Sequence, residues 1–403
     1  MSSKQVENEE EIGLLSSPDA TAITSTRVPT PLPKLQIAIL LFLQICDPIA
    51  GQSIYPYINQ LIGELDITGG DPRKVGYYAG LVESLYYAME GMTILQWGRA
   101  SDRVGRKPIL LLGLFGTTLS MLSFGLSRTF WALITSRALC GLLNGNLSVM
   151  KSAMGEITDP TNRAQAFAMI PVIWAISSTV GPMIGGALAR PHDHFPKIFA
   201  GKFWRDYPYF LPCAAVTAII FVAFIVTVFF FKENIGQPIP LSYQTLPRRS
   251  VEKAPDGTFA PATVSINPVP LRQLFVYPVV ISVSNYGVLA FLDITMLALI
   301  PLFMAMPVDI GGLGCSPAKI GLALGIFGIG FGVFQAVLFA KIVDRFGEKR
   351  IFIASILSCP LIFASFPVMS VIAQERGVTW IVWVILGLML ILMGVMNMGY
   401  GKR

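Results

Sequence analysis

Charged residues are scarce in this sequence of 403 residues: Asp, Glu, Lys and Arg together make up 13% of it, and histidine occurs twice. Soluble domains carry about 25% charged residues, because a surface in water needs ions. Hydrophobic residues reach 53%. The shortage of charge therefore excludes an ordinary soluble domain and indicates a membrane protein.

Cysteine is also sparse, and its spacing excludes a zinc or disulfide framework. No two cysteines form a CxxC pair, and most lie in apolar segments; the five are Cys46, Cys140, Cys213, Cys315 and Cys359. We interpret them as small buried hydrophobic residues. We therefore expect no metal site and no cofactor.

Sequence motifs of enzymes and of ATP-driven pumps are missing. The sequence contains no GxxxxGK[ST] nucleotide-binding loop, no HExxH and no GxSxG. These absences argue against an ATP-driven pump and against an enzyme. We also expect no nucleic-acid partner.

Long apolar segments account for most of the chain. A helix needs about 20 apolar residues to span the hydrocarbon of a bilayer. Ten segments qualify, at roughly 35–61, 75–97, 108–126, 130–150, 164–188, 209–231, 274–303, 319–339, 351–371 and 380–400. Because the first and seventh contain Pro48 and Pro301, we expect both to be kinked or tilted. The sequence predicts an all-α, multi-pass membrane protein with about ten transmembrane helices.

Polar segments divide the chain into parts. Residues 1–34 are rich in Ser, Thr and Pro and predict a disordered cytosolic tail. A polar cytosolic connector at 232–273 leaves six predicted helices in 35–231 and four in 274–403. We therefore expect two helical bundles embedded in the lipid bilayer.

Lysine and arginine indicate the orientation. They concentrate in the turns 97–107 and 340–350 and in the connector, which all fall on one side of the predicted membrane. The loop 189–208 is the exception, because on the other side it carries Arg190, Lys197, Lys202 and Arg205. We expect both termini on the cytosolic side.

A charged turn occurs twice, each time after the second predicted helix of a bundle. The first copy reads WGRASDRVGRKPILL from Trp97, and the second reads AKIVDRFGEKRIFI from Ala340. Ordinary cytosolic flanking charge would explain the Lys and Arg residues of both turns. It does not explain the ordered Asp-Arg-x-Gly, whose Gly fits a tight turn and whose Asp can cap a helix. The repeat indicates a duplicated bundle.

The first turn carries a known signature. Its residues match GxxxDRxGRK in full and are Gly98, Asp102, Arg103, Gly105, Arg106 and Lys107. On these residues the sequence resembles the major facilitator superfamily. The second copy keeps Asp344, Arg345, Gly347 and Lys349, with Ala340 at the position of the first glycine. The resemblance implies that both turns take part in a conformational switch.

Two further segments resemble motifs of this superfamily. Arg137 and Gly141 match its buried-arginine motif, and the antiporter motif of drug:proton exporters is matched by Gly181, Pro182, Gly185 and Gly186. Ser177 and Ala168 stand where that motif has earlier glycines. The segments PTPLPKLQIAILL and DPIAGQSIYPYINQLI resemble fungal and plant exporters grouped with the zinc-induced facilitators.

The resemblance implies a function. It predicts a secondary active transporter in the plasma or vacuolar membrane, acting as a monomer by alternating access and exporting small organic molecules in exchange for protons. The superfamily has twelve helices, so the four predicted in the second half lead us to expect a truncated product. The alternative is a non-transporting truncated product or a membrane sensor of substrate.

Ionisable residues inside the predicted helices are the candidates for proton coupling and substrate binding, because charge in a membrane is expensive. They are Asp47, Glu83, Glu90, Arg137 and Asp293, with Asn144, Asn146 and Gln44 as uncharged polar neighbours. Glu83 and Glu90 lie seven residues apart and share a helix face. Alternatively, each carboxylate is the structural partner of Arg137. The resemblance places the first, fourth, seventh and tenth helices around the cavity, which favours Asp47 and, by pseudo-symmetry, Asp293.

Overall fold

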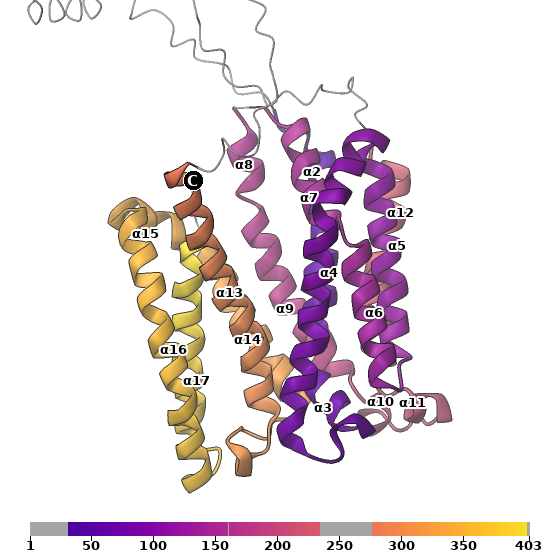
Figure 1. The fold of residues 1–403 in the computed structure, drawn as a ribbon, viewed down its shortest axis with the longest axis vertical. Coiled ribbons are helices and arrows are strands. Elements are labelled where there is room, and N and C mark those ends of the chain that lie inside the picture. Colours follow the sequence, from indigo (N-terminus) through magenta and orange to yellow (C-terminus); the bar gives the residue numbers. More distant parts are fainter. Residues whose placement is uncertain (1–30, 160, 234–275, 401–403) are drawn as a thin grey trace, which may run out of the picture.

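The computed structural model describes residues 31–159, 161–233 and 276–400, and all regular elements in these ranges are helices (Figure 1). The expected tail and connector lie outside the described residues, except for 31–34 and 232–233. Helices α2 to α12 form one bundle and α13 to α17 form the other, each with its own buried apolar core. The predicted all-α fold of two bundles is confirmed.

The first bundle follows the predicted segments, but three of these are divided, among them the segment at 164–188, which forms α8 and α9. The segment at 35–61 is divided into α2 (Lys34–Ile54) and α3 (Ile58–Gly63), and the segment at 130–150 into α6 (Phe130–Leu143) and α7 (Asn146–Ile157). The other helices are α4 (Val75–Val104), α5 (Arg106–Gly125), α8 (Arg163–Phe167), α9 (Ile170–Leu188), α10 (Pro191–His194), α11 (Lys202–Asp206) and α12 (Phe210–Phe230).

The second bundle has fewer described helices. They are α13 (Tyr277–Ala305), α14 (Pro317–Val337), α15 (Phe339–Phe346), α16 (Glu348–Arg376) and α17 (Trp380–Asn397). Backbone hydrogen bonds fold residues 306–316 into a compact turn between α13 and α14. Pro48 lies inside α2 and Pro301 inside α13, so neither proline ends its helix.

Eight helices in the described ranges are long and apolar enough to cross a membrane. The predicted spans at 75–97 and 130–150 are not among them, because α4 carries several charged residues and α6 and α7 are separated by a break. Figure 1 shows both running through the first bundle beside the others. The predicted number of ten helices is therefore not confirmed.

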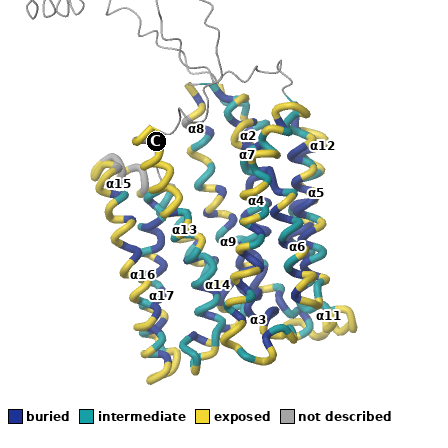
Figure 2. The backbone as a smooth tube through the Cα atoms, viewed as in Figure 1, coloured by how far each residue is buried: buried dark blue, intermediate teal, exposed yellow. Residues whose placement is uncertain are grey.

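Large apolar side chains cover much of the outside of the helices, where Figure 2 marks exposed positions on most of them. Phe115, Phe221, Phe229, Leu357 and Ile391 are examples, each more than half exposed. Soluble monomers rarely expose apolar patches larger than a few hundred Å². This surface suits a lipid environment and supports the assignment as an integral, multi-pass membrane protein.

The exceptional loop at 189–208 has its charge partly neutralised. Arg190 contacts Glu64 at 3.0 Å and Asp193 at 2.7 Å. Asp206 of the same loop contacts Arg128 at 3.1 Å. Local ion pairs thus reduce the excess of positive charge that would otherwise oppose the predicted orientation.

Helices α9 and α14 join the two bundles and form the most extensive helix–helix contact in the described structure. A Cβ atom on Gly186 would lie 2.5 Å from the Pro317 carbonyl oxygen, and one on Gly321 would lie 3.0 Å from the Gly186 Cα. Further along α14, a Cβ atom on Gly328 would lie 2.8 Å from the Ser178 carbonyl carbon. Glycine lets two backbones approach in this way inside a membrane.

The antiporter motif therefore faces two helices. Gly186 lies against α14, whereas Gly181 and Gly185 lie against α2. A Cβ atom on Gly181 would lie 3.1 Å from the Gln52 Cβ, and one on Gly185 would collide with the Ser53 backbone. The motif positions α9 between α2 of its own bundle and α14 of the other.

Gly321→Ala is expected to lower stability by about 1–3 kcal/mol, because the new methyl group meets backbone atoms that cannot rotate away. The matched control is Gly330→Ala on the same helix, where a Cβ atom has no neighbour within 4 Å. Thermal unfolding of the detergent-purified variants measures the difference. Equal melting temperatures for the two would contradict the close contact.

Both described ends of the chain lie at one end of the molecule, together with the turns that follow α4 and α15 (Figure 1). An epitope tag at residue 2 and another after Arg403 are expected to be protected from protease in sealed cells, because the positive charge of the turns predicts a cytosolic location for this end. Both tags should become accessible after permeabilisation. Digestion of either tag in sealed cells would overturn the orientation.

Candidate functional site in the first bundle

The fourth predicted span breaks at Asn144 and Gly145, between α6 and α7. Asn144 has extended backbone angles, φ −84° and ψ 90°. The indole Nε1 of Trp97 donates a hydrogen bond to the Leu142 carbonyl at 2.8 Å. Broken helices are tolerated at membrane depth only when other groups satisfy the freed backbone atoms. Trp97 does so here and fixes the break against α4.

The break directs the Asn144 side chain toward two carboxylates. Its Nδ2 donates to Asp47 Oδ1 at 2.8 Å, to the Tyr86 hydroxyl at 2.8 Å and, more weakly, to Glu90 Oε1 at 3.4 Å. The Tyr86 hydroxyl also donates to Asp47 Oδ1 at 3.1 Å. Asp47 and Glu90 come from α2 and α4, so one amide links three parts of the bundle. Asp47, Tyr86, Glu90 and Asn144 are called the carboxylate cluster below.

The cluster provides a place for a proton. Two carboxylates that share one donor repel each other when both are ionised, and a proton bound by either of them removes that repulsion. When Asp47 is ionised, the Asn144 amide and the Tyr86 hydroxyl both donate hydrogen bonds to its carboxylate.

Arg137 lies beside the cluster but is paired with Glu83. Its Nη2 contacts Glu83 Oε2 at 2.9 Å, and the side chains of Arg137 and Glu83 are 2% and 7% exposed. The Tyr55 hydroxyl donates to the other Glu83 oxygen at 2.9 Å. Glu83 is therefore the structural partner of Arg137, which was the alternative interpretation of this carboxylate. The described contacts do not include a hydrogen bond or ion pair between Arg137 and Asp47.

Tyr86 connects the ion pair with the carboxylate cluster. The Arg137 guanidinium lies 4.6 Å from the centre of the Tyr86 ring, whose hydroxyl binds Asp47. Gly141 permits this packing, because a Cβ atom there would collide with the Tyr86 carbonyl oxygen and approach the Glu90 nitrogen to 3.1 Å. The second residue of the buried-arginine motif therefore brings α6 onto α4.

Two further polar residues of the first bundle lack partners. Gln44 is 2% exposed, and neither of its amide atoms has a hydrogen-bond partner in the described structure. It precedes Asp47 by three residues on α2 and so lies on the same helix face. Asn146 Oδ1 also has no partner, and its side chain packs on Gly113 of α5. Unsatisfied buried amides are groups that a bound ligand or water can satisfy.

Asp293 lies in the other bundle, on α13, and no described contact joins it to the carboxylate cluster. Asn397 of α17 hydrogen-bonds to its carboxyl group, while Oδ1 has no partner. The structure therefore brings together Asp47, Glu90 and Asn144, places Glu83 with Arg137 beside them, and leaves Asp293 separate.

The first charged turn forms an ionic network within its own bundle. Gly105 separates α4 from α5 with φ 109°, as expected for a tight turn at glycine. Arg106 contacts Asp102 at 2.6 Å and Glu156 at the end of α7 at 2.5 Å. Gly98, at the start of the signature, lies on α4 beside Ser148 of α7. Arg103 has no ion pair among the described residues.

The observed contacts at the start of α5 differ from the expected helix cap. Asp102 lies in the last turn of α4 and binds Arg106, so it does not cap α5. Instead, Glu233 Oε1 accepts a hydrogen bond from the Lys107 backbone nitrogen at 3.3 Å, at the start of α5. Sequence reasoning missed both Glu156 and Glu233, which carry no motif. The one feature of the sequence that could have indicated them is their negative charge on the predicted cytosolic side, which is rich in Lys and Arg.

The second charged turn repeats the backbone of the first. Gly347 separates α15 from α16 with φ 78°. The Arg345 guanidinium lies 5.9 Å from the Phe346 ring centre. The side chains of Ala340 and Asp344 lie outside those that the structure describes.

All five cysteines are buried and unpaired. In the described residues, no group of three or more His, Cys, Asp or Glu side chains is placed to hold a metal ion.

Glu83→Gln is expected to destabilise the protein by about 3–5 kcal/mol, because it leaves the Arg137 charge buried without a counter-charge. Thermal unfolding and the yield of monodisperse protein measure the loss. The double variant Glu83→Leu with Arg137→Met is expected to be more stable than Glu83→Gln. Ser84→Ala, at the exposed neighbouring position, is the control. Parental stability of Glu83→Gln would show that the pair is not needed.

The chain is similar to known proteins over most of its length. The sequence profile described as Major Facilitator Superfamily matches residues 40–401. The major facilitator-type transporter psiT2 of Psilocybe cyanescens is 29% identical over 389 residues, which cover 89% of this chain and 73% of that protein. The efflux pump azaK of Aspergillus niger is 32% identical over 316 residues, which cover 78% of this chain and 61% of that protein. The chain thus spans 61–73% of these two relatives.

Solved structures show the same fold. The D-xylose-proton symporter matches with a TM-score of 0.59 at 14% identity, over 91% of this chain and 80% of that one. The human organic anion transporter MFSD10 matches with a TM-score of 0.52 at 18% identity, over 93% and 87% of the two chains. Together with the family match over 40–401, these findings show that the chain belongs to the major facilitator superfamily.

Proposed function

We propose that this chain is a proton-coupled transporter that exports small organic molecules across the plasma or vacuolar membrane as a monomer. The observation that carries the proposal is the carboxylate cluster at the break between α6 and α7. Relatives support the direction and the substrate class, since they include an efflux pump of Aspergillus niger and a multidrug transporter of Aspergillus fumigatus. We also propose the division into a bundle at 35–231 and a second at 274–403, joined by a cytosolic connector.

In this mechanism Asp47 carries the coupling proton, with Glu90 as its neighbour. Protonation of Asp47 removes the acceptor charge that holds the Asn144 amide and the Tyr86 hydroxyl. Asn144 forms the break between α6 and α7, so a change in its hydrogen bonds alters the relation of these two half-helices. Gln44, on the same face of α2, is the proposed substrate contact, because its amide atoms have no protein partner.

Movement passes from the cluster to the other bundle through α2 and α9. Asp47 lies on α2, and the next turn of α2 packs on Gly181 and Gly185. Gly186, on another face of α9, packs on α14. Close backbone contacts transmit a shift of α2 because the packed atoms leave no free volume to absorb it. The rocking of two bundles about such a seam is the general mode of alternating access.

Asp47→Asn is expected to abolish efflux driven by a pH gradient, because the amide keeps the hydrogen-bonding shape but binds no proton. Ethidium efflux from vesicles reconstituted with the full chain is the measurement. The transport rate should fall to that of protein-free vesicles, while the melting temperature stays close to that of the parent. Asp66→Asn, at an exposed carboxylate of the loop after α3, is the matched control and should transport normally.

Two outcomes would redirect the proposal. Normal pH-driven efflux by Asp47→Asn would move the coupling role to Glu90, Glu83 or Asp293. Absence of pH-driven efflux by the parent chain, with well-folded protein in the vesicles, would contradict proton-coupled transport of this probe.

A further inference from the structure

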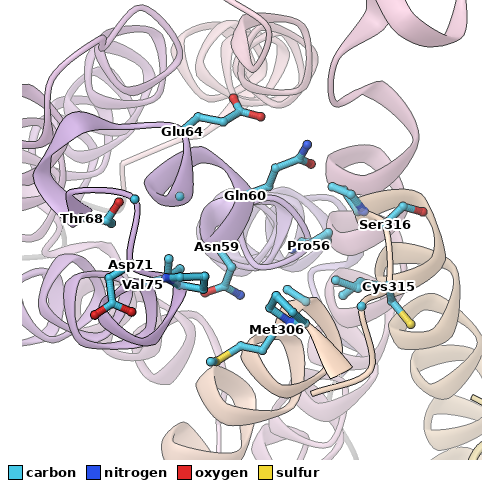
Figure 3. Close-up of a pocket in the computed structure, with 18 residues that line it drawn as sticks. Pro56, Asn59, Gln60, Glu64, Thr68, Asp71, Val75, Met306, Cys315 and Ser316 are labelled. Atoms are coloured by element: carbon cyan, nitrogen blue, oxygen red, sulfur yellow. The ribbon is translucent and has the colours of Figure 1, made fainter. Parts of the chain in front are cut away.

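A cavity of about 450 Å³ lies between the two bundles (Figure 3), beside α3 and so at the end of the molecule opposite the charged turns (Figure 1). One wall is α3 with the loop that leads to α4, and the other is the end of α13 with the start of α14. No residue of the carboxylate cluster lines it. Its volume is typical of small-molecule sites, which span about 300–1,000 Å³.

The wall from the second bundle is preformed. Backbone hydrogen bonds join Leu313 to Phe303 at 3.0 Å, Gly314 to Met306 at 2.8 Å and Cys315 to Met304 at 2.7 Å. They hold the turn after α13 firmly against the helix end. A ligand that enters therefore meets a wall that needs little ordering, and a preorganised site loses less entropy on binding.

Two amides of α3 at the cavity have unsatisfied atoms. Asn59 is 5% exposed, and its Oδ1 has no hydrogen-bond partner in the described structure. Gln60 Oε1 has none either. In Figure 3 the Asn59 side chain lies between α3 and Met306 of the opposite wall. A buried polar atom without a partner is destabilising, so a ligand that donates hydrogen bonds here is favoured.

The charges at the cavity are negative. Glu64 and Asp71 line it and no Lys or Arg does, although the charge of Lys319 acts on the lining residue Cys315. Glu64 is shared with Arg190, 3.0 Å away, whereas Asp71 forms no ion pair in the described part of the chain. Figure 3 shows both carboxylates at the edge of the site rather than at its centre. A negative rim raises the local concentration of cations and repels anions.

We propose that this cavity is a binding site for a small organic ammonium ion. Its N–H groups donate to the amides of Asn59 and Gln60, and its charge lies toward the carboxylate rim. Its apolar part packs on Pro56, Met306 and Ile320. Because the walls belong to different bundles, the bound ion favours the state in which the bundles meet at this end.

The site does not depend on the proposed function, and Cys315 provides its readout. This thiol lines the cavity, and the other four cysteines do not. A full-length variant with Cys46, Cys140, Cys213 and Cys359 replaced by alanine leaves Cys315 as the single thiol. Burial raises the pKa of Cys315, and the thiolate is the reacting form. Labelling by a methanethiosulfonate reagent is therefore measured at about pH 8.5, near the ordinary thiol pKa.

Phenethylammonium is the probe, and it is expected to slow labelling of Cys315 in a saturable manner. Two matched compounds separate its properties. 2-Phenylethanol has the same shape without the charge, and phenethyltrimethylammonium has the charge without N–H donors. Both are expected to protect less than phenethylammonium at equal concentration.

Two variants of Asn59 are expected to act in opposite directions. Asn59→Leu removes the amide and should raise the concentration for half-protection about tenfold, the loss of one hydrogen bond to a charged group. Asn59→Asp adds a carboxylate of similar size and should lower that concentration. A general folding defect would weaken both. Asp66→Asn, exposed in the same loop but outside the cavity, is the control and should leave it unchanged.

The proposal is overturned if phenethylammonium fails to protect Cys315 in monodisperse protein, or if 2-phenylethanol protects equally well. It is also overturned if Asn59→Leu leaves half-protection unchanged, or if both Asn59 variants weaken it. Protection without ethidium efflux would support this site and contradict the transport proposal alone. Ethidium efflux without protection of Cys315 would support the transport proposal and contradict this site.

Discussion

A polar group in the membrane-spanning part of this protein must find its partner within the protein, because lipid offers none. The Arg137–Glu83 pair and the break between α6 and α7 both follow from this constraint. Arg137 is almost fully buried and takes Glu83 and the face of Tyr86 as neighbours. The break leaves a carbonyl that Trp97 satisfies. Asn144 and the Tyr86 hydroxyl then bind Asp47, and the Asn144 amide also reaches Glu90. The carboxylate cluster is thus what remains after the structural needs of the bundle are met.

The second determinant is close contact between backbones. Helix α9 lies between α2 and α14, and its glycines face both. On α14 the complementary glycines Gly321, Gly325 and Gly328 recur every three or four residues, which places them on one face. A side chain at these positions would separate the helices and weaken the dispersion contacts that hold helices together in lipid, where the hydrophobic effect does not act between them. The connection between the bundles therefore depends on the absence of side chains.

Sequence patterns predicted what depends on local chemistry. The glycines of both charged turns adopt the positive φ that the motif requires, and the buried cysteines are unpaired. The partner of Arg137 was not predictable, because Glu83, Glu90 and Asp47 are all acidic, and only the packing of α6 along α4 places Arg137 beside Glu83. Glu156 and Glu233 escaped notice for the same reason, since their partners lie 50 and 126 residues away in the sequence. The glycine face of α14 was not predicted either, because nothing in the sequence indicates which helix packs against it.

The first bundle and its contact with the second bundle are held together by different forces. All ion pairs in the described residues lie within the first bundle, including those of the charged turn. The described contacts between the bundles include close backbone approaches along α9 and α14 and an apolar contact of Gly76 with Leu302. Apolar surfaces slide without exposing a buried charge, whereas breaking a buried ion pair is strongly unfavourable. Ion pairs therefore hold the first bundle together, whereas its contact with the second bundle rests on backbone and apolar packing.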